Sequence, residues 1–400
     1  MSRPELLAPA GDIECLRTAL HFGADAVYIG GDFMQMRSGK VGFTREDIEN
    51  AVGIAHEAGG KLYVAVNCFA RNEEIDSLPE YARFLDGAGA DAAIISDIGV
   101  VGLFKKTVPS LPVHISTQAN CTNYAAANAW RALGASRIVL ARELNLDEIA
   151  VIRKNTPPDL QLECFVHGAM CMAYSGRCLI SSFLNARSGN RGECTQPCRW
   201  EYYLAEKKRP GEYFPVEEQD GASAILSSHD LRCIDFLDRI ESAGVCSFKI
   251  EGRMKTPYYV GTVTNAYRRA IDGGADTEEL RRELDCVSHR PYSSGFYFGR
   301  EKDGHYNDGA YHTECSFAAK VLDSRGDEMT VEQRNAFSVG DELEVVSPCL
   351  LGAKLTVEKI ISAEGEPKKT ASLVQEHVRI NGLSGVRPGD LLRMRVKNDG

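Results

Sequence analysis

The sequence predicts an α/β protein: a (β/α)8 barrel followed by a small antiparallel β-barrel domain. Three observations predict this architecture. Short, nearly continuous apolar segments alternate with amphipathic helical segments over residues 1–167, which is typical of a parallel sheet covered by helices. Eight such apolar segments can be found, and this number favours a closed barrel over an open doubly wound sheet. After residue 312 the hydrophobic pattern becomes alternating, with glycine turns between the segments, as in antiparallel strands.

The helix boundaries in this region carry recognisable caps. Asp12 precedes the helical segment 13–22, and Thr44 with Asp47 forms a capping-box pattern before the next helix. Several helices end on a glycine that leads directly into a strand, and glycine accepts the left-handed conformation of a helix end. The eight expected strands are Glu5–Pro9, Ala26–Gly30, Lys61–Asn67, Ala92–Ser96, Val113–Thr117, Arg137–Ala141, Gln161–Val166 and Ser247–Glu251.

The pattern also predicts how the 400 residues divide into parts. We expect the barrel over residues 1–272, interrupted between strands 7 and 8 by a cysteine-rich insertion at 168–228. Residues 230–243 are amphipathic and are expected to form a helix. Residues 273–312 are predicted to form a linker helix and an extended aromatic arm, and residues 313–400 the small β-barrel domain.

The insertion contains four of the thirteen cysteines in the pattern C-x6-C-x15-C-x3-C: Cys171, Cys178, Cys194 and Cys198. Single buried cysteines are common in proteins, but this loop has little apolar sequence for the thiols to join. Disulfides are disfavoured because Met1–Pro9 does not resemble a secretion signal, so a reducing cytoplasmic location is expected. Zinc is less favoured than an iron–sulfur cluster, because only Cys194 and Cys198 have the short spacing of a zinc knuckle.

Six segments resemble the collagenase-like peptidase family U32: 163–171, 175–181, 189–194, 248–255, 288–292 and 6–11. Better-understood branches of that family are iron–sulfur proteins that hydroxylate RNA bases with prephenate, or ubiquinone precursors without oxygen. In the quinone branch the fourth cluster ligand lies far downstream of the third, as Cys233 does here. The resemblance thus implies a [4Fe–4S] cluster on Cys171, Cys178, Cys194 and Cys233, with Cys198 in reserve.

Polar residues at the carboxyl ends of barrel strands usually form the active site, and any single one of them can instead be a structural rim residue. Arginine forks match carboxylates, so Arg37, Arg142 and Arg253 are expected to clamp prephenate. Glu143 is predicted to lie in the same substrate site. His167 is a candidate for proton transfer near neutral pH. The predicted catalytic residues are His167, Glu251, Asn67 and Gln118.

The formal charge of −10 argues against extensive coating of nucleic acid. A local excess of basic residues nevertheless surrounds the cysteines between residues 177 and 209. This basic segment is either a solvated loop or an RNA-binding surface. For the second interpretation, Arg187, Arg191 and Lys207 are the predicted RNA contacts.

The favoured function is hydroxylation of a tRNA wobble uridine to 5-hydroxyuridine, as the family resemblance implies. A collagenase-like peptidase is an alternative, although neither an H-E-x-x-H motif nor a G-x-S-x-G motif occurs. Further alternatives are rRNA as the substrate, an oxygen-independent ubiquinone-precursor hydroxylase, and a cluster-bearing subunit that works with a related family protein. No apolar run is long enough to predict a membrane span.

Overall fold

The structure is a computed structural model. It describes residues 3–35, 42–171, 173–200, 203–205, 213–215, 229–299 and 311–396. The chain forms two compact units. The first comprises Met1–Leu16, Asp25–Met254 and His289–Tyr311, and the second comprises Arg17–Ala24, Lys255–Ser288 and His312–Gly400.

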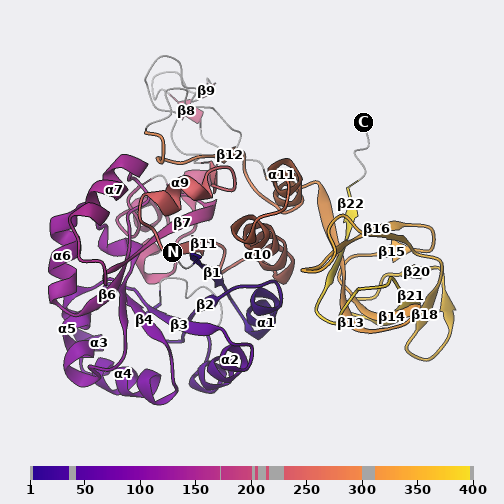
Figure 1. The fold of residues 1–400 in the computed structure, drawn as a ribbon, viewed down its shortest axis with the longest axis horizontal. Helices are drawn as coiled ribbons and strands as arrows, with labels where there is room; N and C mark the ends of the chain where they lie inside the picture. The colour runs from indigo at the N-terminus through magenta and orange to yellow at the C-terminus, as the bar shows by residue number, and fades with distance from the viewer. Residues whose placement is uncertain are drawn as a thin grey trace. The chain divides into compact units, whose positions relative to one another are not determined.

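The first unit contains the predicted closed barrel of parallel strands (Figure 1). Neighbouring strands pair in sequence order, and the last strand closes the ring against the first and the seventh: Glu5 lies opposite Ser247, and Ser247 lies opposite Glu163. The strands are almost entirely buried, which explains their continuous apolar sequences. They are β1 (Glu5–Pro9), β2 (Ala26–Gly30), β3 (Lys61–Val66), β4 (Ala92–Ile95), β5 (Val113–Ile115), β6 (Ala135–Val139), β7 (Gln161–Ala169) and β11 (Ser247–Ile250).

Helices surround this ring of strands (Figure 1). The predicted caps form: Thr44 and Asp47 make the capping box of α2, and the Cys15 backbone N–H donates to Asp12 at 2.7 Å. Asp97 accepts from the N–H groups of Gly99 and Val100, so this rim carboxylate caps a helix. The helices are α1 (Ile13–His21), α2 (Arg45–Glu57), α3 (Asn72–Ile75), α4 (Leu78–Gly87), α5 (Ile98–Thr107), α6 (Tyr124–Ala132), α7 (Leu146–Lys154) and α9 (Leu237–Ser242).

The segment after the cysteine loop differs from its predicted helix. Only α9 is helical, whereas Asp230–Arg232 forms strand β10, antiparallel to the extended end of β7. The reason is a buried ion pair: Arg290 donates to Asp230 at 2.7 Å, and both side chains are almost fully enclosed. Asp230 also pairs with Tyr292 of β12 (Tyr292–Ser293). Tertiary contacts therefore override the helical pattern of this segment.

The second unit contains helices α10 (Pro257–Asp272) and α11 (Thr277–Asp285) and an antiparallel β half-barrel. Its sheet packs over a core that includes Val331, Leu343, Ile380 and Leu392. The sheet order is β17-β16-β22-β13-β14-β21-β18-β19. These strands are β13 (Cys315–Arg325), β14 (Glu328–Gln333), β16 (Glu342–Val346), β17 (Lys354–Thr356), β18 (Ile360–Ser362), β19 (Pro367–Lys368), β21 (His377–Asn381) and β22 (Leu391–Arg395).

A small second sheet in this unit pairs β15 (Phe337–Ser338) with β20 (Thr370–Ala371). Thr256 caps α10, and Pro257 occupies its first turn, where a missing N–H does no harm. Among the helices that the structure describes, none has the length and apolar character needed to cross a membrane.

Candidate functional site

A pocket opens at the carboxyl ends of the barrel strands, with a volume of about 620 Å³ that includes its solvent-open part. Strands on several sides of the ring contribute to it, because parallel strands bring their carboxyl ends to one edge. The pocket is lined by Tyr28, Ala65, Asn67, Ile94, Ser116, Thr117, Gln118, Val139, Arg142, Phe165, Cys171, Ser175, Lys249, Glu251 and Arg253.

The pocket brings together five of the seven predicted catalytic and substrate-binding residues that the structure describes. Asn67 and Gln118 line it together with Arg142, Glu251 and Arg253. Predicted from separate segments of the chain, these residues meet only because the barrel closes. Cys171, the first residue of the predicted cysteine set, lines the same pocket.

The two arginines of the pocket are held in different ways. The Arg142 guanidinium lies 3.9 Å from the centroid of the Phe165 ring, and its Nη1 donates to the Ala169 carbonyl at 2.8 Å. Arg253 is buried, and two glycines lie close to it. A side chain at Gly11 would clash with the Arg253 carbonyl oxygen, whereas one at Gly30 would displace the ends of the Arg253 and Gln35 side chains. Gly11 therefore allows the close backbone approach at Arg253.

Lys249 is a pocket residue that the sequence analysis missed. It lies in β11, its Nζ is 3.1 Å from Glu163, and it is 4.4 Å from the centroid of the Tyr28 ring. Burial lowers the pKa of Lys249. The sequence did contain a signal for this residue, because Lys249 is a charged residue inside an otherwise apolar strand. A lysine at such a position is buried only when it has a charged partner.

Glu163 anchors a buried network beneath the pocket. It accepts hydrogen bonds from Lys249, from Arg137 at 3.0 Å and from the Ser247 hydroxyl at 3.0 Å. Burial opposes ionisation, but the charges of Lys249 and Arg137 outweigh it and lower the pKa of Glu163 to about 2. The carboxylate therefore stays charged and keeps Lys249 directed toward the pocket.

Other predicted residues lie elsewhere. His167 is buried on β7, where its ring is 5.5 Å from that of Tyr292, and it does not line the pocket; its carbonyl accepts from the Glu251 N–H at 2.9 Å. Glu143 is half-buried outside the lining, and burial raises its pKa. Arg37 and Lys207 lie outside the described residues.

The predicted cluster ligands divide into two groups. Cys171 and Cys194 are exposed and Cys178 is half-buried. A Cβ atom at Gly189 would lie 3.5 Å from Cys194 Cβ and 3.8 Å from the Cys178 carbonyl oxygen, so these two cysteines flank one glycine. Cys233, in contrast, is fully buried, and burial followed by the nearby Cys164 raises its pKa well above the usual value.

The three loop cysteines fit a cluster by their chemistry. Their thiols are accessible, and the Gln196 backbone N–H points at Cys194 Sγ at 3.4 Å, an interaction that tunes cluster sulfurs. Among described residues, no three of the predicted ligands have sulfurs within 4.8 Å of one another. The ligand sulfurs of a [4Fe–4S] cluster lie farther apart than those around a single ion, because each cysteine binds a different iron. Of the two residues predicted for the fourth ligand position, Cys233 is buried and Cys198 is half-buried in the turn Pro197–Arg199.

Polar contacts attach the cysteine loop to the barrel. Asn190 accepts from the Phe69 backbone N–H at 3.0 Å, and its side-chain amide donates to Gln118 at 3.3 Å. Arg191 forms an ion pair with Glu74 and lowers the pKa of that carboxyl. The predicted RNA contact Arg191 thus has a carboxylate partner within the protein, whereas Arg187 is exposed.

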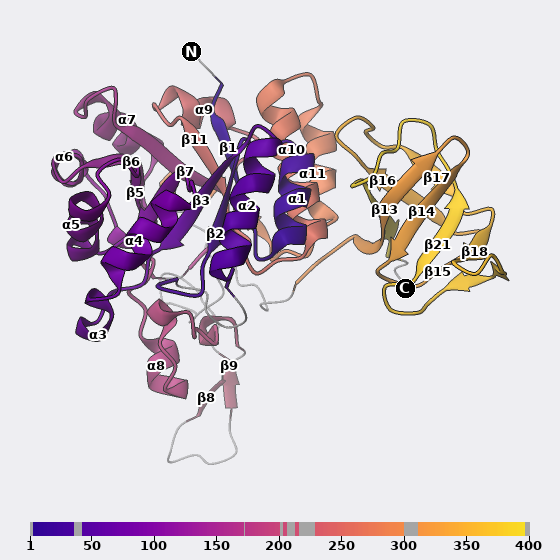
Figure 2. The ribbon, with the colours of Figure 1, turned by 90° about the horizontal axis from the view of Figure 1, so that it is seen from below.

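The loop also exposes large apolar side chains that the sequence analysis did not identify. Phe183 is 83% exposed on α8 (Ile180–Asn185), next to exposed Leu184, and Tyr174 and Trp200 are also exposed. Figure 2 shows α8 beyond the carboxyl ends of the barrel strands. Exposed aromatic groups of this kind commonly mark a binding surface.

Comparison with known proteins shows similarity along most of the chain. The model described as peptidase family U32 matches residues 11–307, and the model of its C-terminal domain matches residues 313–393. The chain is 37% identical over 402 residues to "tRNA hydroxylation protein P1" of Bacillus subtilis, covering 98% of this chain and 94% of that protein. It is 36% identical to "tRNA hydroxylation protein P" of Escherichia coli, with 92% and 91% covered.

A third relative carries a different RNA in its name. The chain is 39% identical over 270 residues to the "23S rRNA 5-hydroxycytidine C2501 synthase" of Escherichia coli, covering 68% of this chain and 39% of that protein. The matched families and relatives thus extend over both units of the structure.

Proposed function

Because the chain belongs to peptidase family U32, a family that includes enzymes, we propose that it hydroxylates RNA, with a tRNA wobble uridine as its substrate and 5-hydroxyuridine as its product. The observation that carries the proposal is the position of Cys171 in the wall of a pocket that also contains Arg142, Lys249 and Arg253. A thiol loop suited to a cluster thereby meets a positively charged pocket suited to an acidic metabolite.

The pocket residues support binding of prephenate, which carries two carboxylates. Arg142 and Arg253 supply guanidinium groups, against the one carboxylate of Glu251. Lys249 also faces the pocket, but its charge is balanced in a buried network in which Lys249 and Arg137 pair with Glu163 and Glu5. The positive pocket therefore favours a dianion over a neutral ligand.

The amides of Asn67 and Gln118 are suited to recognise the base. An amide carries both donor and acceptor groups, which is what the edge of a pyrimidine requires, although the Gln118 oxygen also accepts from Asn190. Uracil has to leave the base stack to reach a pocket of this kind, so an unpaired loop nucleotide is the expected substrate. Glu251 lies beside these groups and is positioned to hold or move a proton.

A [4Fe–4S] cluster is part of the proposal. Cys171, Cys178 and Cys194 would hold it together with either Cys233 or Cys198. When bound, the cluster supplies electron transfer at the edge of the pocket. The pocket residues would hold the base and prephenate next to each other and exclude water around them.

The exposed aromatic groups of the cysteine loop provide the RNA contact in this proposal. Tyr174, Phe183 and Trp200 present rings on which unpaired bases can stack. Arg177 and Arg187 are exposed in the same loop and supply charge for the phosphates. Stacking and local charge together explain how an acidic protein would bind an anticodon loop.

The decisive experiment is nucleoside mass spectrometry of tRNA and rRNA from a deletion strain. We expect hydroxylated uridine to disappear from tRNA and to return with the wild-type gene and with Cys349→Ala, an exposed thiol of the second unit. Cys171→Ala should not restore it. Loss of a hydroxylated cytidine from rRNA would instead make rRNA the substrate, as in the name of the third relative. Unchanged nucleosides with altered peptide turnover would support a peptidase.

A further inference from the structure

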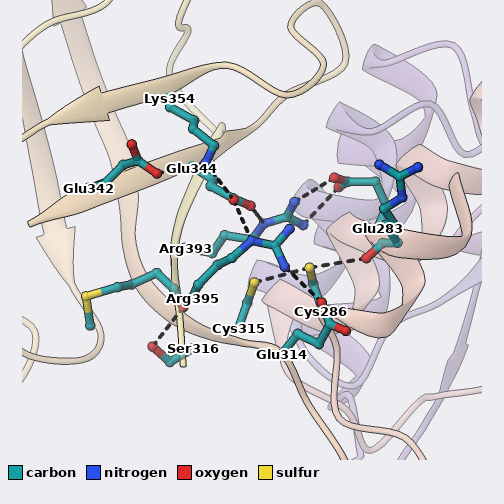
Figure 3. A network of polar contacts seen from close by, with 12 residues as sticks. Glu283, Cys286, Glu314, Cys315, Ser316, Glu342, Glu344, Lys354, Arg393 and Arg395 are labelled. Carbon is teal, nitrogen blue, oxygen red and sulfur yellow. Dashed lines mark hydrogen bonds and ion pairs between the residues drawn. The ribbon is translucent and has the colours of Figure 1, made fainter. Parts of the chain in front are cut away.

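Two buried thiols meet in the second unit, far along the chain from the cysteine loop. Cys286 is the residue that ends α11, and Cys315 begins β13. Their sulfurs are 3.1 Å apart, and both side chains are buried. We propose that Cys286 and Cys315 form a redox-active dithiol, a site where a peroxide reversibly generates a disulfide (Figure 3).

The backbone around the thiols is already held in place for such a bond. The Thr313 hydroxyl lies 3.1 Å from the Cys286 carbonyl and 2.9 Å from the Cys315 carbonyl, and it donates to this pair of acceptors. The Glu314 N–H donates to the Asp285 carbonyl at 3.1 Å. The end of α11 and the start of β13 are thus joined next to the sulfurs, so bond formation requires little backbone movement.

Charged groups enclose the pair and make the two thiols unequal. Arg393 donates to Glu283 at 2.6 Å and to Glu344 at 2.9 Å, and Arg395 donates to Glu344 at 2.8 Å. Figure 3 shows both guanidinium groups beside the two sulfurs. Because the arginines bring positive charge to the sulfurs, they favour a thiolate at this place.

Cys315 is the better nucleophile of the two. Cys286 lies at the negative end of α11, and its Sγ donates to the Arg282 carbonyl at 3.3 Å, so its thiolate is disfavoured. With both thiols protonated, Cys315 Sγ donates to Cys286 Sγ at 3.1 Å. Once Cys315 has lost its proton, the Cys286 thiol turns from the Arg282 carbonyl and donates to the Cys315 thiolate. This contact, helped by Arg393 and opposed by burial, lowers the pKa of Cys315, while the same contact raises that of Cys286.

The chemistry balances with hydrogen peroxide as the oxidant. The Cys315 thiolate attacks one peroxide oxygen, which gives a sulfenic acid and hydroxide; the hydroxide takes the proton that the thiol had released and becomes water. The Cys286 sulfur then attacks the Cys315 sulfur, and the oxygen bound to Cys315 leaves as water with the proton of the Cys286 thiol. In total two thiols and one peroxide give one disulfide and two water molecules. A dithiol reductant reverses the change by thiol–disulfide exchange.

A metal ion is the competing occupant, since a Glu344 oxygen and both sulfurs lie within 4.8 Å of one another. Both Glu344 oxygens, however, already accept from guanidinium groups at 2.9 and 2.8 Å. Metal binding would have to break these ion pairs and place a divalent cation against two arginines. The charge distribution therefore favours oxidation of the thiols over metal binding.

The test uses the full-length protein purified without oxygen and treated with hydrogen peroxide. Remaining thiols are alkylated, and peptides are analysed by mass spectrometry with and without dithiothreitol. We expect a reducible peptide pair joined through Cys286 and Cys315, lighter by two hydrogens than the reduced pair. The pair should also form in Cys171→Ala, which separates it from cluster chemistry. Cys349→Ala is the matched control and should leave its yield unchanged.

Single variants test the assigned order of the steps. In Cys286→Ala, Cys315 should stop at the sulfenic acid and react with dimedone, whereas Cys286 in Cys315→Ala should not. Arg395→Gln should slow disulfide formation roughly threefold to tenfold, because the thiolate loses a neighbouring cation. The proposal is overturned if peroxide that fully oxidises Cys349 gives no Cys286–Cys315 pair in wild type. It is also overturned if wild type holds one zinc ion per chain that Cys286→Ala loses.

Discussion

The cysteine loop and the barrel interior beneath it use reactive residues in opposite ways. The loop exposes its thiols Cys171 and Cys194 and its aromatic side chain Phe183 to solvent. The interior encloses Glu163 and Lys249 almost completely and pairs them with each other. Exposed groups are available to a cofactor or a macromolecule, whereas buried paired charges shape a pocket and set its electrostatic potential. We therefore expect substitutions in the loop to reduce activity and substitutions in the interior to reduce stability.

The largest expected effect is at the loop. Cys171→Ala should remove iron and acid-labile sulfide from protein purified without oxygen and abolish hydroxylation, while the melting temperature changes little. Iron analysis and thermal unfolding check this. Cys121→Ala, a buried single cysteine of the barrel, is the control and should retain iron. Full iron occupancy in Cys171→Ala would remove this residue from the ligand set.

The same measurement identifies the fourth ligand. If Cys233 binds the cluster, Cys233→Ala should lose iron while Cys198→Ala keeps it. Because Cys233 is buried in this structure, the variant should also be compared with Cys164→Ala, its buried neighbour. Iron loss in Cys198→Ala alone would assign the fourth position to the loop itself.

The interior should respond through stability. Glu163→Gln leaves Lys249 and Arg137 without their shared carboxylate, and breaking a buried pair costs about 3–5 kcal/mol. Denaturant unfolding of the wild type and the variant measures this. Glu5→Gln is a matched control because Glu5 also pairs with Arg137. A smaller loss of stability is expected for it because Glu5 is more exposed than Glu163. An unchanged unfolding midpoint would show that the network does not stabilise the barrel.

The depressed pKa of Glu163 makes a related prediction about pH. The folded pKa of about 2 lies below the usual value of 4.5, so ionised Glu163 stabilises the folded state above about pH 4.5. This contribution, about 3 kcal/mol from the difference of the two pKa values, is lost as pH falls from 4.5 toward 2. Unfolding free energies across this range should rise with pH in wild type and rise less in Glu163→Gln.

The pocket between these two regions should show an intermediate effect. Arg253→Lys keeps the charge but loses the planar fork that fits a carboxylate, so we expect at least a tenfold lower kcat/KM for the acid metabolite. Arg142→Lys should act similarly, with an added loss of contact to Phe165. Arg239→Lys, whose side chain lies over the Phe298 ring away from the pocket, is the control. Normal hydroxylation in both pocket variants would exclude the carboxylate clamp.

The last comparison concerns RNA binding by the loop. Phe183→Ala should weaken tRNA binding by about 1–3 kcal/mol per stacked base without changing the salt dependence. Arg187→Gln should instead lower the slope of log affinity against log salt by about 0.7 to 0.9. Lys106→Gln, a charge outside the loop, should change neither. Equal salt slopes for wild type and Arg187→Gln would remove this arginine from the phosphate contacts.

The sequence by itself determined the barrel and several of the rim residues that line its pocket. Strand positions follow from continuous apolar segments, and Thr44 with Asp47 specifies a helix start through contacts only three residues apart. Asn67, Gln118, Arg142, Glu251 and Arg253 were predictable because parallel strands must bring their carboxyl ends together. These inferences succeed because they depend on local periodicity and on a general property of the barrel.

Only the tertiary structure decided which polar residues work as pairs. Asp230 begins a strand because Arg290 is buried against it, although its own segment has a helical pattern. Lys249 faces the pocket because Glu163 neutralises it across 86 positions of the chain. Cys286 and Cys315 lie 29 positions apart in the chain, and no local sequence pattern predicts that they meet beside two arginines. Burial of a charge or thiol is stable only with its partner, and the choice of partner is a long-range property of the fold.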